Sequence, residues 1–235
     1  MEALPRRTVS PEFDRFAAEY EKLLRDPVRD YFAPGSGFFL TRKLEVLLDF
    51  SATMGVDTRR ATWVDVGCGK GELLRAGRSH FARVTGCDVS REMIGGCPDL
   101  DVVPQLESDR VPFGDRSADL VTAVCAYHHV EPRSWANLTA DIRRVLKPGG
   151  IFAMIEHNPL NPAVRAIVGR TPVDEHAVLL TAGTAGRLMR DAGLQVVGTR
   201  YFLYVPQRFY RWAGAVERAL ARVPLGGQYS VFGMK

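Results

Sequence analysis

A glycine-rich turn between an apolar segment and a helical pattern constrains the fold of this chain more than any other feature. The stretch ATWVDVGCGKGELL, residues 61–74, passes from β-branched and aromatic residues through an acid and three glycines into an amphipathic segment. Glycines tolerate positive φ and leave room for a ligand close to the backbone. The amides at the start of the following helix point at such a ligand. The stretch therefore predicts a strand, a ligand-binding loop and a helix.

Two acids distinguish this loop from one that binds a pyrophosphate. The glycines Gly67, Gly69 and Gly71 follow the spacing G-x-G-x-G, whereas a dinucleotide loop is usually spaced G-x-G-x-x-G. Asp65, just before the first glycine, would repel a pyrophosphate and attract a cation, which disfavours a nicotinamide dehydrogenase. Asp88 ends a second apolar segment, where a carboxylate can take both hydroxyls of a ribose. Together these features predict a nucleoside ligand that carries a positive group.

Five successive motifs resemble those of the class I S-adenosylmethionine-dependent methyltransferases, and in particular the type 11 and quinone-biosynthesis enzymes. They are VDVGCGKG, GCDVS with Met93 after it, ESDRVPF, SADLVTAVCAYHHV and RRVLKPGGIF, in the family's order over about residues 61–157. The resemblance implies S-adenosylmethionine as the cofactor. It also implies an α/β fold with a doubly wound, mostly parallel seven-stranded sheet in the order 3-2-1-4-5-7-6, whose last strand is antiparallel.

Alternating strand and helix patterns agree with that fold. We expect strands at 62–67, 83–88, 101–107, 118–126, 151–156, 194–201 and 228–234, with helices at 11–24, 39–51, 72–80, 91–95, 133–146 and 181–192. Ser10 and Pro11 have the residue types that begin a helix. In the family such N-terminal helices cover the cofactor as a lid; a plain helical layer on the sheet is the alternative.

These patterns divide the chain into two parts. Residues 1–50 are expected to form an N-terminal helical lid, and residues 51–235 a Rossmann-like methyltransferase domain. Two insertions, 157–180 and 203–227, interrupt the alternation and exceed the usual connection of a few residues. We therefore expect substrate specificity to reside in the two insertions.

Composition limits the setting in which the protein works. With 235 residues, 46% of them hydrophobic, the chain can bury one sizeable core. It has no apolar run of the ~20 residues that span a bilayer and no signal-peptide pattern, so we expect a cytoplasmic protein. The net charge of +4 is modest, and AYHHVEP replaces the N-P-P-Y or D-P-P-Y loop of nucleic-acid methyltransferases, so no nucleic-acid partner is expected.

Matching motif positions imply the cofactor contacts. Asp65 would lie near the methionine ammonium, and Asp88 would hold the ribose hydroxyls. The remaining positions are Gly67, Cys68 and Gly69 along the methionine, Val89 and Met93 at the nucleoside, Asp109 and Arg110 beside the adenine, and Ala126 through its backbone. Met93 is alternatively a residue of the helix core.

The candidate catalytic residues follow two strands that are neighbours in the expected order. His128 and His129 come after the fourth strand and Glu156 ends the fifth, and ligands of such sheets bind at the carboxyl ends of the strands. A histidine can take a proton from the acceptor, and Glu156 can orient that histidine or act itself. Alternatively, His129 packs on the next helix and Glu156 caps a backbone.

Further polar residues are candidates for contact with the acceptor. They are Tyr127 and His157 beside the catalytic candidates, and Arg165 and His176 in the first insertion, where Asp174 and Arg170 also lie. Alternatively, the polar residues of the insertion are surface charges. The histidines and Glu156 have the chemistry to hold a divalent metal. We expect none, because metal-using members of the family employ clustered acidic ligands.

The second insertion contains an amphipathic segment, PQRFYRWAGAVERALARV, residues 206–223. At 100° per residue, one stripe consists of Phe209, Trp212, Ala213, Val216, Leu220 and Val223, and Arg208, Arg211, Arg218 and Arg222 form another beside it. The apolar stripe either docks a lid helix on the sheet or touches a membrane surface or an anionic lipid-linked acceptor.

The combined prediction is methyl transfer from S-adenosylmethionine to an oxygen or nucleophilic carbon of a small molecule, such as a natural product, an isoprenoid or lipid-linked compound, or a sugar. The alternative is a non-catalytic partner or regulatory protein that binds S-adenosylmethionine. Such a protein would keep Asp65 and Asp88 but lack an acceptor cavity.

Overall fold

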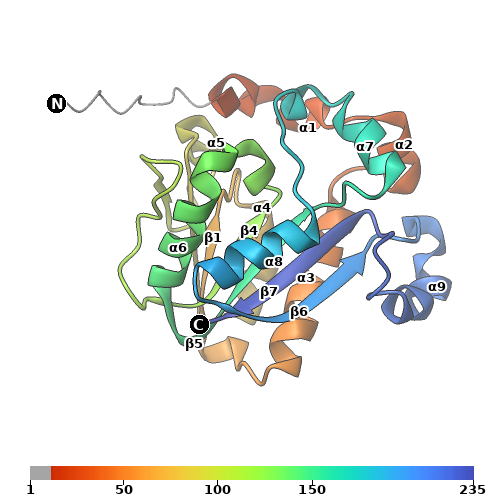
Figure 1. Cartoon of the computed structure of the whole chain (residues 1–235). Coiled ribbons are helices and arrows are strands. Elements are labelled where there is room, and N and C mark those ends of the chain that lie inside the picture. Colours follow the sequence, from red (N-terminus) through yellow and green to blue (C-terminus); the bar gives the residue numbers. More distant parts are fainter. Residues whose placement is uncertain (1–11) are drawn as a thin grey trace.

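Seven strands form one twisted sheet in the order β3-β2-β1-β4-β5-β7-β6, as expected (Figure 1). The computed structural model describes residues 12–235, so the expected helix start at Ser10 and Pro11 lies outside the described residues. The strands are β1 (Thr62–Val66), β2 (Arg83–Asp88), β3 (Val102–Pro104), β4 (Ala118–Val124), β5 (Leu146–His157), β6 (Gln195–Phe202) and β7 (Gln228–Met234). β1 to β5 pair in parallel, and β7 is antiparallel to β5 and β6. The carboxyl ends of β1 to β5 therefore share one edge.

Helices cover both faces of the sheet (Figure 1). The α-helices of the described residues are α1 (Tyr20–Leu23), α2 (Pro27–Phe32), α3 (Gly37–Thr53), α4 (Glu72–Gly77), α5 (Arg91–Gly95), α6 (Trp135–Val145), α7 (Pro162–Val168), α8 (Ala182–Asp191) and α9 (Gln207–Ala219). Alternate strand residues point to opposite faces. Val64 and Val121 accordingly join the core under α6 and α8, while Trp63 and Leu120 join the core under α3 and α4.

The N-terminal segment differs from the expectation in two respects. The first helix is a 3-10 helix over Glu12–Glu19 that continues into the short α1. An additional helix, α2, follows because Asp26 accepts hydrogen bonds from the amides of Val28 and Arg29, and Pro27 occupies the first helical position. This Asp-Pro start is visible in the sequence, although our prediction did not include it.

Helix α3 belongs to the core of the sheet domain. The boundary expected at residue 50 falls inside this helix. Leu44, Leu47 and Phe50 are buried against the sheet, and the Phe50 ring stacks on Phe232 with centroids 3.6 Å apart. Of the two readings of the N-terminal helices, α3 therefore fits the helical layer.

Both insertions lie at or beyond the carboxyl edge of the sheet (Figure 1). The first carries α7 and a 3-10 turn, Pro172–Asp174, and the second carries α9. Ion pairs tie them to the N-terminal segment, between Arg170 and Asp26 at 2.9 Å and between Arg42 and Glu217 at 2.9 Å. Within residues 12–235, no helix is both long and apolar enough to span a membrane.

Candidate active site

The loop after β1 has the backbone geometry that its glycines allow. The φ angles of Gly67, Gly69 and Gly71 are 73°, 52° and 69°. A Cβ on Gly67 would lie only 2.7 Å from the Cβ of Ala126, so the loop after β1 and the loop after β4 touch at this point. Only glycine fits here, because both its φ and its free space are restricted.

Asp88 is held in place by the amides of this loop. One carboxylate oxygen accepts a hydrogen bond from the Gly69 amide and the other from the Ser90 amide, each at 2.8 Å. Burial raises the pKa of Asp88, and these two amides oppose the shift. A carboxylate oxygen can accept two hydrogen bonds, so Asp88 could also accept from the hydroxyls of a ribose.

Asp65 is a buried carboxyl group whose pKa lies near neutral pH. Burial raises its pKa to about 7, although the Thr122 hydroxyl, which donates to it at 2.5 Å, and the charge of Lys43 both lower it. A cation placed beside Asp65 would restore the ionised form.

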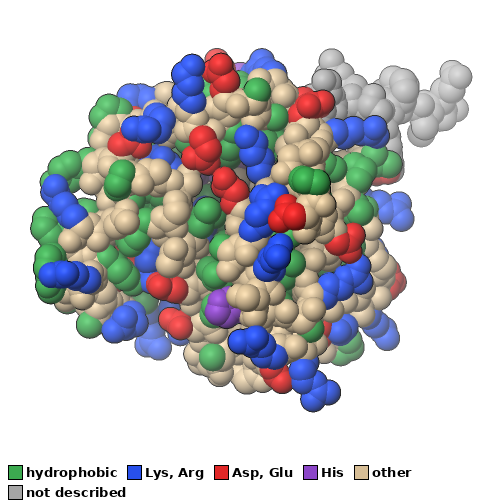
Figure 2. All heavy atoms as spheres, turned by 180° about the vertical axis from the view of Figure 1, so that it is seen from behind, with side chains coloured by type: hydrophobic (Ala, Val, Ile, Leu, Met, Phe, Trp, Pro, Cys, Tyr) green, Lys and Arg blue, Asp and Glu red, His purple; other side chains and the backbone are tan. Residues whose placement is uncertain are grey.

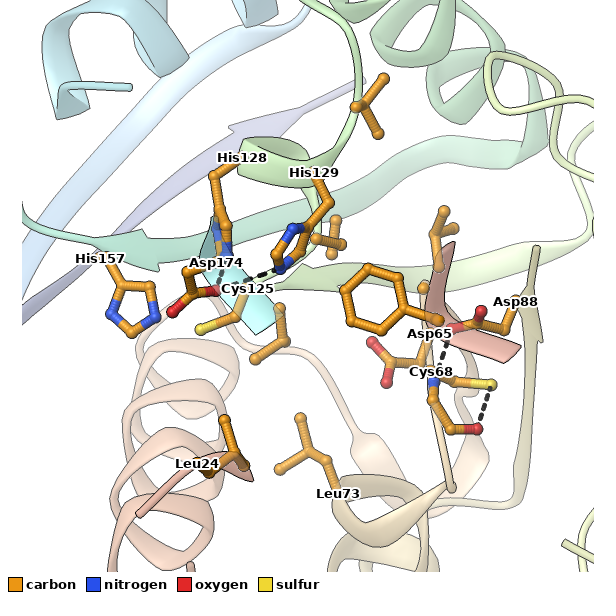
Figure 3. A pocket seen from close by; sticks show the side chains of 18 of the residues that line it. Leu24, Asp65, Cys68, Leu73, Asp88, Cys125, His128, His129, His157 and Asp174 are labelled. Atoms are coloured by element: carbon orange, nitrogen blue, oxygen red, sulfur yellow. Dashed lines mark hydrogen bonds and ion pairs between the residues drawn. The ribbon is translucent and has the colours of Figure 1, made fainter. Parts of the chain in front are cut away.

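A cavity of about 1540 Å³ runs along the carboxyl edge of the sheet. Figure 3 shows Asp65, Cys68 and Asp88 on one side of it and a histidine cluster on the other. The expected cofactor residues that line it are Asp65, Gly67, Cys68, Gly69, Asp88, Val89, Met93, Asp109 and Ala126. Arg110 is exposed and does not line the cavity, so the expected contact with the adenine is not supported for this residue.

His128 lies between two carboxylates. Its Nδ1 is 2.5 Å from Glu156 Oε2, and its Nε2 is 3.5 Å from Asp174 Oδ1. Burial alone would lower the pKa of His128, but the charge of Glu156 and the hydrogen bond to Asp174 raise it to about 10. His128 is therefore an imidazolium at neutral pH and has no free site for another proton.

Glu156 organises the loop after β4. Its Oε1 accepts hydrogen bonds from the backbone amides of Ala126 and Tyr127, at 3.0 and 2.7 Å, while Oε2 holds His128. The carboxylate is fully buried and does not line the cavity. This geometry matches the alternative in which Glu156 caps a backbone, and it fixes the orientation of His128 and favours its protonated form.

His129 and His157 line the cavity as neutral imidazoles. Burial and the positive charge of His128 lower the pKa of His129 to about 3 and that of His157 to about 4. His129 Nε2 lies 3.4 Å from Asp174 Oδ1, and the ring packs edge-on against Phe13 with centroids 4.7 Å apart. His129 is thus a neutral imidazole with a carboxylate beside it (Figure 3).

The comparisons with known proteins agree with this arrangement. The sequence model of the methyltransferase domain matches residues 64–154. An uncharacterized methyltransferase of Synechocystis is 33% identical over 57% of this chain and 66% of its own length. A ubiquinone biosynthesis O-methyltransferase of Burkholderia pseudomallei is 27% identical over 61% of this chain and 68% of its own. A sterol 24-C-methyltransferase of Gibberella zeae is 35% identical over 40% of this chain but only 27% of its own.

Solved structures show the same fold. A possible histamine N-methyltransferase from Thermotoga maritima aligns with a TM-score of 0.65 at 16% identity, over 95% of this chain and 98% of its own. An S-adenosylmethionine-dependent methyltransferase from Archaeoglobus fulgidus aligns with a TM-score of 0.61 at 17% identity, over 85% and 100%. The chain belongs to the class I S-adenosylmethionine-dependent methyltransferases. Membership confirms the expected enzyme class and S-adenosylmethionine as the cofactor.

One expected acceptor contact of this methyltransferase is wrong in the structure, and a second is not supported. Tyr127 is fully buried in the core under α6, and its hydroxyl hydrogen-bonds to Thr139 Oγ1 at 2.8 Å. Arg165 is exposed on α7 and lies outside the main cavity. Both were chosen from their place in the sequence, which does not fix the direction of a side chain on a turn or a short helix. His157 and His176 do line the cavity.

Three residues that line the cavity of the methyltransferase, Lys43, Cys125 and Gln228, were not predicted from the sequence as site residues. Lys43 of α3 donates to Cys125 Sγ at 3.5 Å, and Gln228 Nε2 donates to the same sulfur at 3.3 Å. Gln228 Oε1 is buried without a hydrogen-bond partner among the described residues. For Lys43 a signal exists, because this cation lies between Leu40, Leu44 and Leu47 on the buried face of a helix.

A metal ion is the remaining option for the histidine cluster. The ligand atoms of His128, His129 and Asp174 lie within 4.8 Å of one another, which is close enough to surround one cation. The imidazolium of His128 already neutralises part of the charge of Glu156 and Asp174. A metal would have to displace that proton.

Proposed function

We propose that this methyltransferase methylates an oxygen or a nucleophilic carbon of a small, largely apolar acceptor. The observation that carries the proposal is the second half of the cavity, beyond the expected cofactor residues. Its walls include Val28, Phe32, Phe39, Leu40, Val164 and Ile167, contributed by α2, α3 and α7. A protein that only bound S-adenosylmethionine would have no use for this space.

Two relatives support a reaction at oxygen or carbon. One is named for O-methylation in ubiquinone biosynthesis and the other for C-methylation of a sterol. The matched segment covers about two thirds of the ubiquinone enzyme and about a quarter of the sterol enzyme. We therefore propose the acceptor class from the cavity, and the reactions for which these relatives are named support it.

The cofactor half of the cavity offers complementary charges. Asp65 would face the methionine ammonium and Asp88 the ribose hydroxyls, with Val89 and Met93 beside the nucleoside. Lys43, whose charge acts on Asp65, is placed to attract the methionine carboxylate. When bound, the cofactor supplies an electrophilic methyl group on a sulfonium.

The histidine cluster would accept the proton that the acceptor loses. His128 is already protonated, so the proposed base is His129, whose imidazole lines the cavity and whose pKa the Asp174 carboxylate raises against the effect of burial. Asp174 lies beside His129 Nε2 and would stabilise the imidazolium that forms. Glu156 and His128 then act as positioning residues, because neither has a site free for the proton.

The test is transfer of a labelled methyl group. Purified protein is incubated with S-adenosylmethionine labelled in the methyl group and a panel of phenols, quinols and sterols. Label in a product extracted into organic solvent supports the proposal. Tight cofactor binding without transfer to any acceptor of the panel favours the non-catalytic alternative.

We also propose a cytoplasmic location, in keeping with four free cysteines, Cys68, Cys87, Cys97 and Cys125.

A further inference from the structure

Helix α9 turns its apolar stripe away from the protein. Trp212 is 66% exposed, Val216 55% and Phe209 46%, whereas the buried residues of the helix are Gly214 and Glu217. The expectation that this stripe docks the helix on the sheet is therefore wrong. An exposed apolar stripe of this kind on a soluble protein calls for a partner.

Directional polar contacts fix this orientation. Glu217 Oε1 accepts from Arg42 Nη2 at 2.9 Å, and Oε2 accepts from the backbone amide of Tyr204 at 2.8 Å. The guanidinium of Arg42 also lies 4.4 Å from the ring centroid of Tyr210 on the inner side of α9. Rotating the helix to bury Trp212 would break a buried ion pair and leave its charges uncompensated.

The exposed side of the second insertion carries only positive charge. Residues 203–227 contain four arginines, and their single acid is the buried Glu217. The arginines are Arg208, Arg211, Arg218 and Arg222, all exposed. In Figure 2, hydrophobic and basic side chains gather at the left edge, on the side of α9. Arg211 lies over the Trp212 ring at 4.1 Å, so basic and apolar groups are interleaved.

The same surface reaches the rim of the cavity. Val28 and Leu225 line the cavity and are also 44% and 61% exposed, which places them at its opening. Tyr31 of α2, another exposed ring, contacts Arg208 of α9. Apolar groups thus extend from α9 to the opening.

We propose that the exposed side of α9 lies on an anionic phospholipid membrane. Phe209, Trp212 and Val216 enter the headgroup region, and the four arginines contact lipid phosphates. This occupant is favoured because a helix with exposed aromatic and aliphatic side chains beside arginines, and with no exposed acid, has the composition of amphipathic helices that lie in an anionic membrane interface. The opening of the cavity then faces the lipid, and an amphiphilic acceptor enters from it. This last step alone rests on the proposed function.

Tryptophan fluorescence tests the proposal directly. Of the three tryptophans, Trp63 and Trp135 are buried and only Trp212 is exposed, so a change in polarity at the surface is reported by Trp212. Vesicles of phosphatidylcholine with phosphatidylglycerol should shift the emission to shorter wavelength, and pure phosphatidylcholine should do so much less. The shift should vanish in Trp212→Phe. Emission that ignores anionic vesicles overturns the proposal and points to a protein partner.

Charge reversal supplies the second arm. Arg211→Glu with Arg218→Glu should weaken sedimentation with anionic vesicles by at least about tenfold, and salt should weaken that of the wild type. Arg59→Glu with Arg60→Glu is the matched control, because these exposed residues precede β1 at the opposite edge of the sheet. Equal losses in both variants overturn the proposal. Neither assay involves methyl transfer, so failure here leaves the proposed reaction untouched. S-adenosylmethionine binding by each variant verifies its fold.

Discussion

Asp174 Oδ1 lies 3.4 Å from His129 Nε2, which joins a residue of the first insertion to the loop after β4. The same oxygen lies 3.5 Å from His128 Nε2. One carboxylate therefore faces a protonated and a neutral imidazole, and the insertion completes the proposed catalytic group.

Replacing His129 should separate catalysis from cofactor binding. We expect His129→Gln to lower kcat by roughly a hundredfold or more, the usual contribution of a general base, and Asp174→Asn to lower it by roughly tenfold or more. The affinity for S-adenosylmethionine should stay within a few fold. The matched control is Glu175→Gln, an exposed acid next to Asp174. Normal turnover in His129→Gln would move the base elsewhere, and His157 is then the next candidate.

Removing Asp88 should weaken cofactor binding without unfolding the protein. Asp88→Ala loses charged hydrogen bonds to the ribose, so we expect binding of S-adenosylmethionine to weaken by about 1.5 to 3 kcal/mol. Calorimetry measures the affinity, and circular dichroism checks the fold. Unchanged affinity would contradict the ribose assignment.

Cofactor binding should depend on pH through Asp65. Its pKa is raised to about 7 in the free protein, and a neighbouring ammonium favours the ionised form. Affinity should therefore rise with pH and level off above about 7, with proton release on binding at pH 6. Calorimetry in buffers of different ionisation enthalpy measures that release. Asp65→Asn should remove it, and equal release from this variant would implicate another group.

Stability should fall between pH 7 and 8.5 because of His128. Its pKa is raised from 6.5 to about 10, so its stabilising contribution is complete below the unfolded pKa and declines as pH rises toward the folded one. The lowered pKa values of His129 and His157 act only below their unfolded value of 6.5. Urea denaturation at several pH values measures the slope. His128→Gln should be less stable and should show a flatter slope, and an unchanged slope would contradict the imidazolium.

Chelation should leave turnover unchanged. The proton on His128 occupies the position where a metal would bind between His128, His129 and Asp174. Activity before and after treatment with EDTA, with metal content measured by mass spectrometry, decides the matter. Loss of activity that zinc or another divalent ion restores would show a metal centre.

Local sequence signals were sufficient to predict many of the helices and strands. The ends of β2, α5 and β7 agree with prediction to the residue, and each element has one marked boundary: Asp88 ends β2, Ser90 caps the start of α5 and Gly227 precedes β7. β3 is shorter than expected, and β5 begins at Leu146 rather than at residue 151. The sheet order came from the resemblance, since strand pairing is a long-range property.

The features of the site that could not be predicted from the sequence depend on long-range contacts. The orientation of α9 depends on Arg42 and Glu217, which are 175 positions apart, and periodicity alone could not tell which face would be buried. Asp174 was recognised only as one of several polar residues in an insertion, because its contact with His129 depends on how that insertion folds back. Tyr127 was misplaced since neighbouring residues on a 3-10 turn point in different directions.

The contact between Gly67 and Ala126 couples the cofactor loop to the turn that carries the proposed base. A side chain on Gly67 would meet Ala126, and Ala126 immediately precedes the turn that carries His128 and His129. A larger residue at position 67 would therefore displace the turn that carries the proposed base. Changes of acceptor preference would arise more readily in the two insertions, which can vary in sequence and length without disturbing this junction.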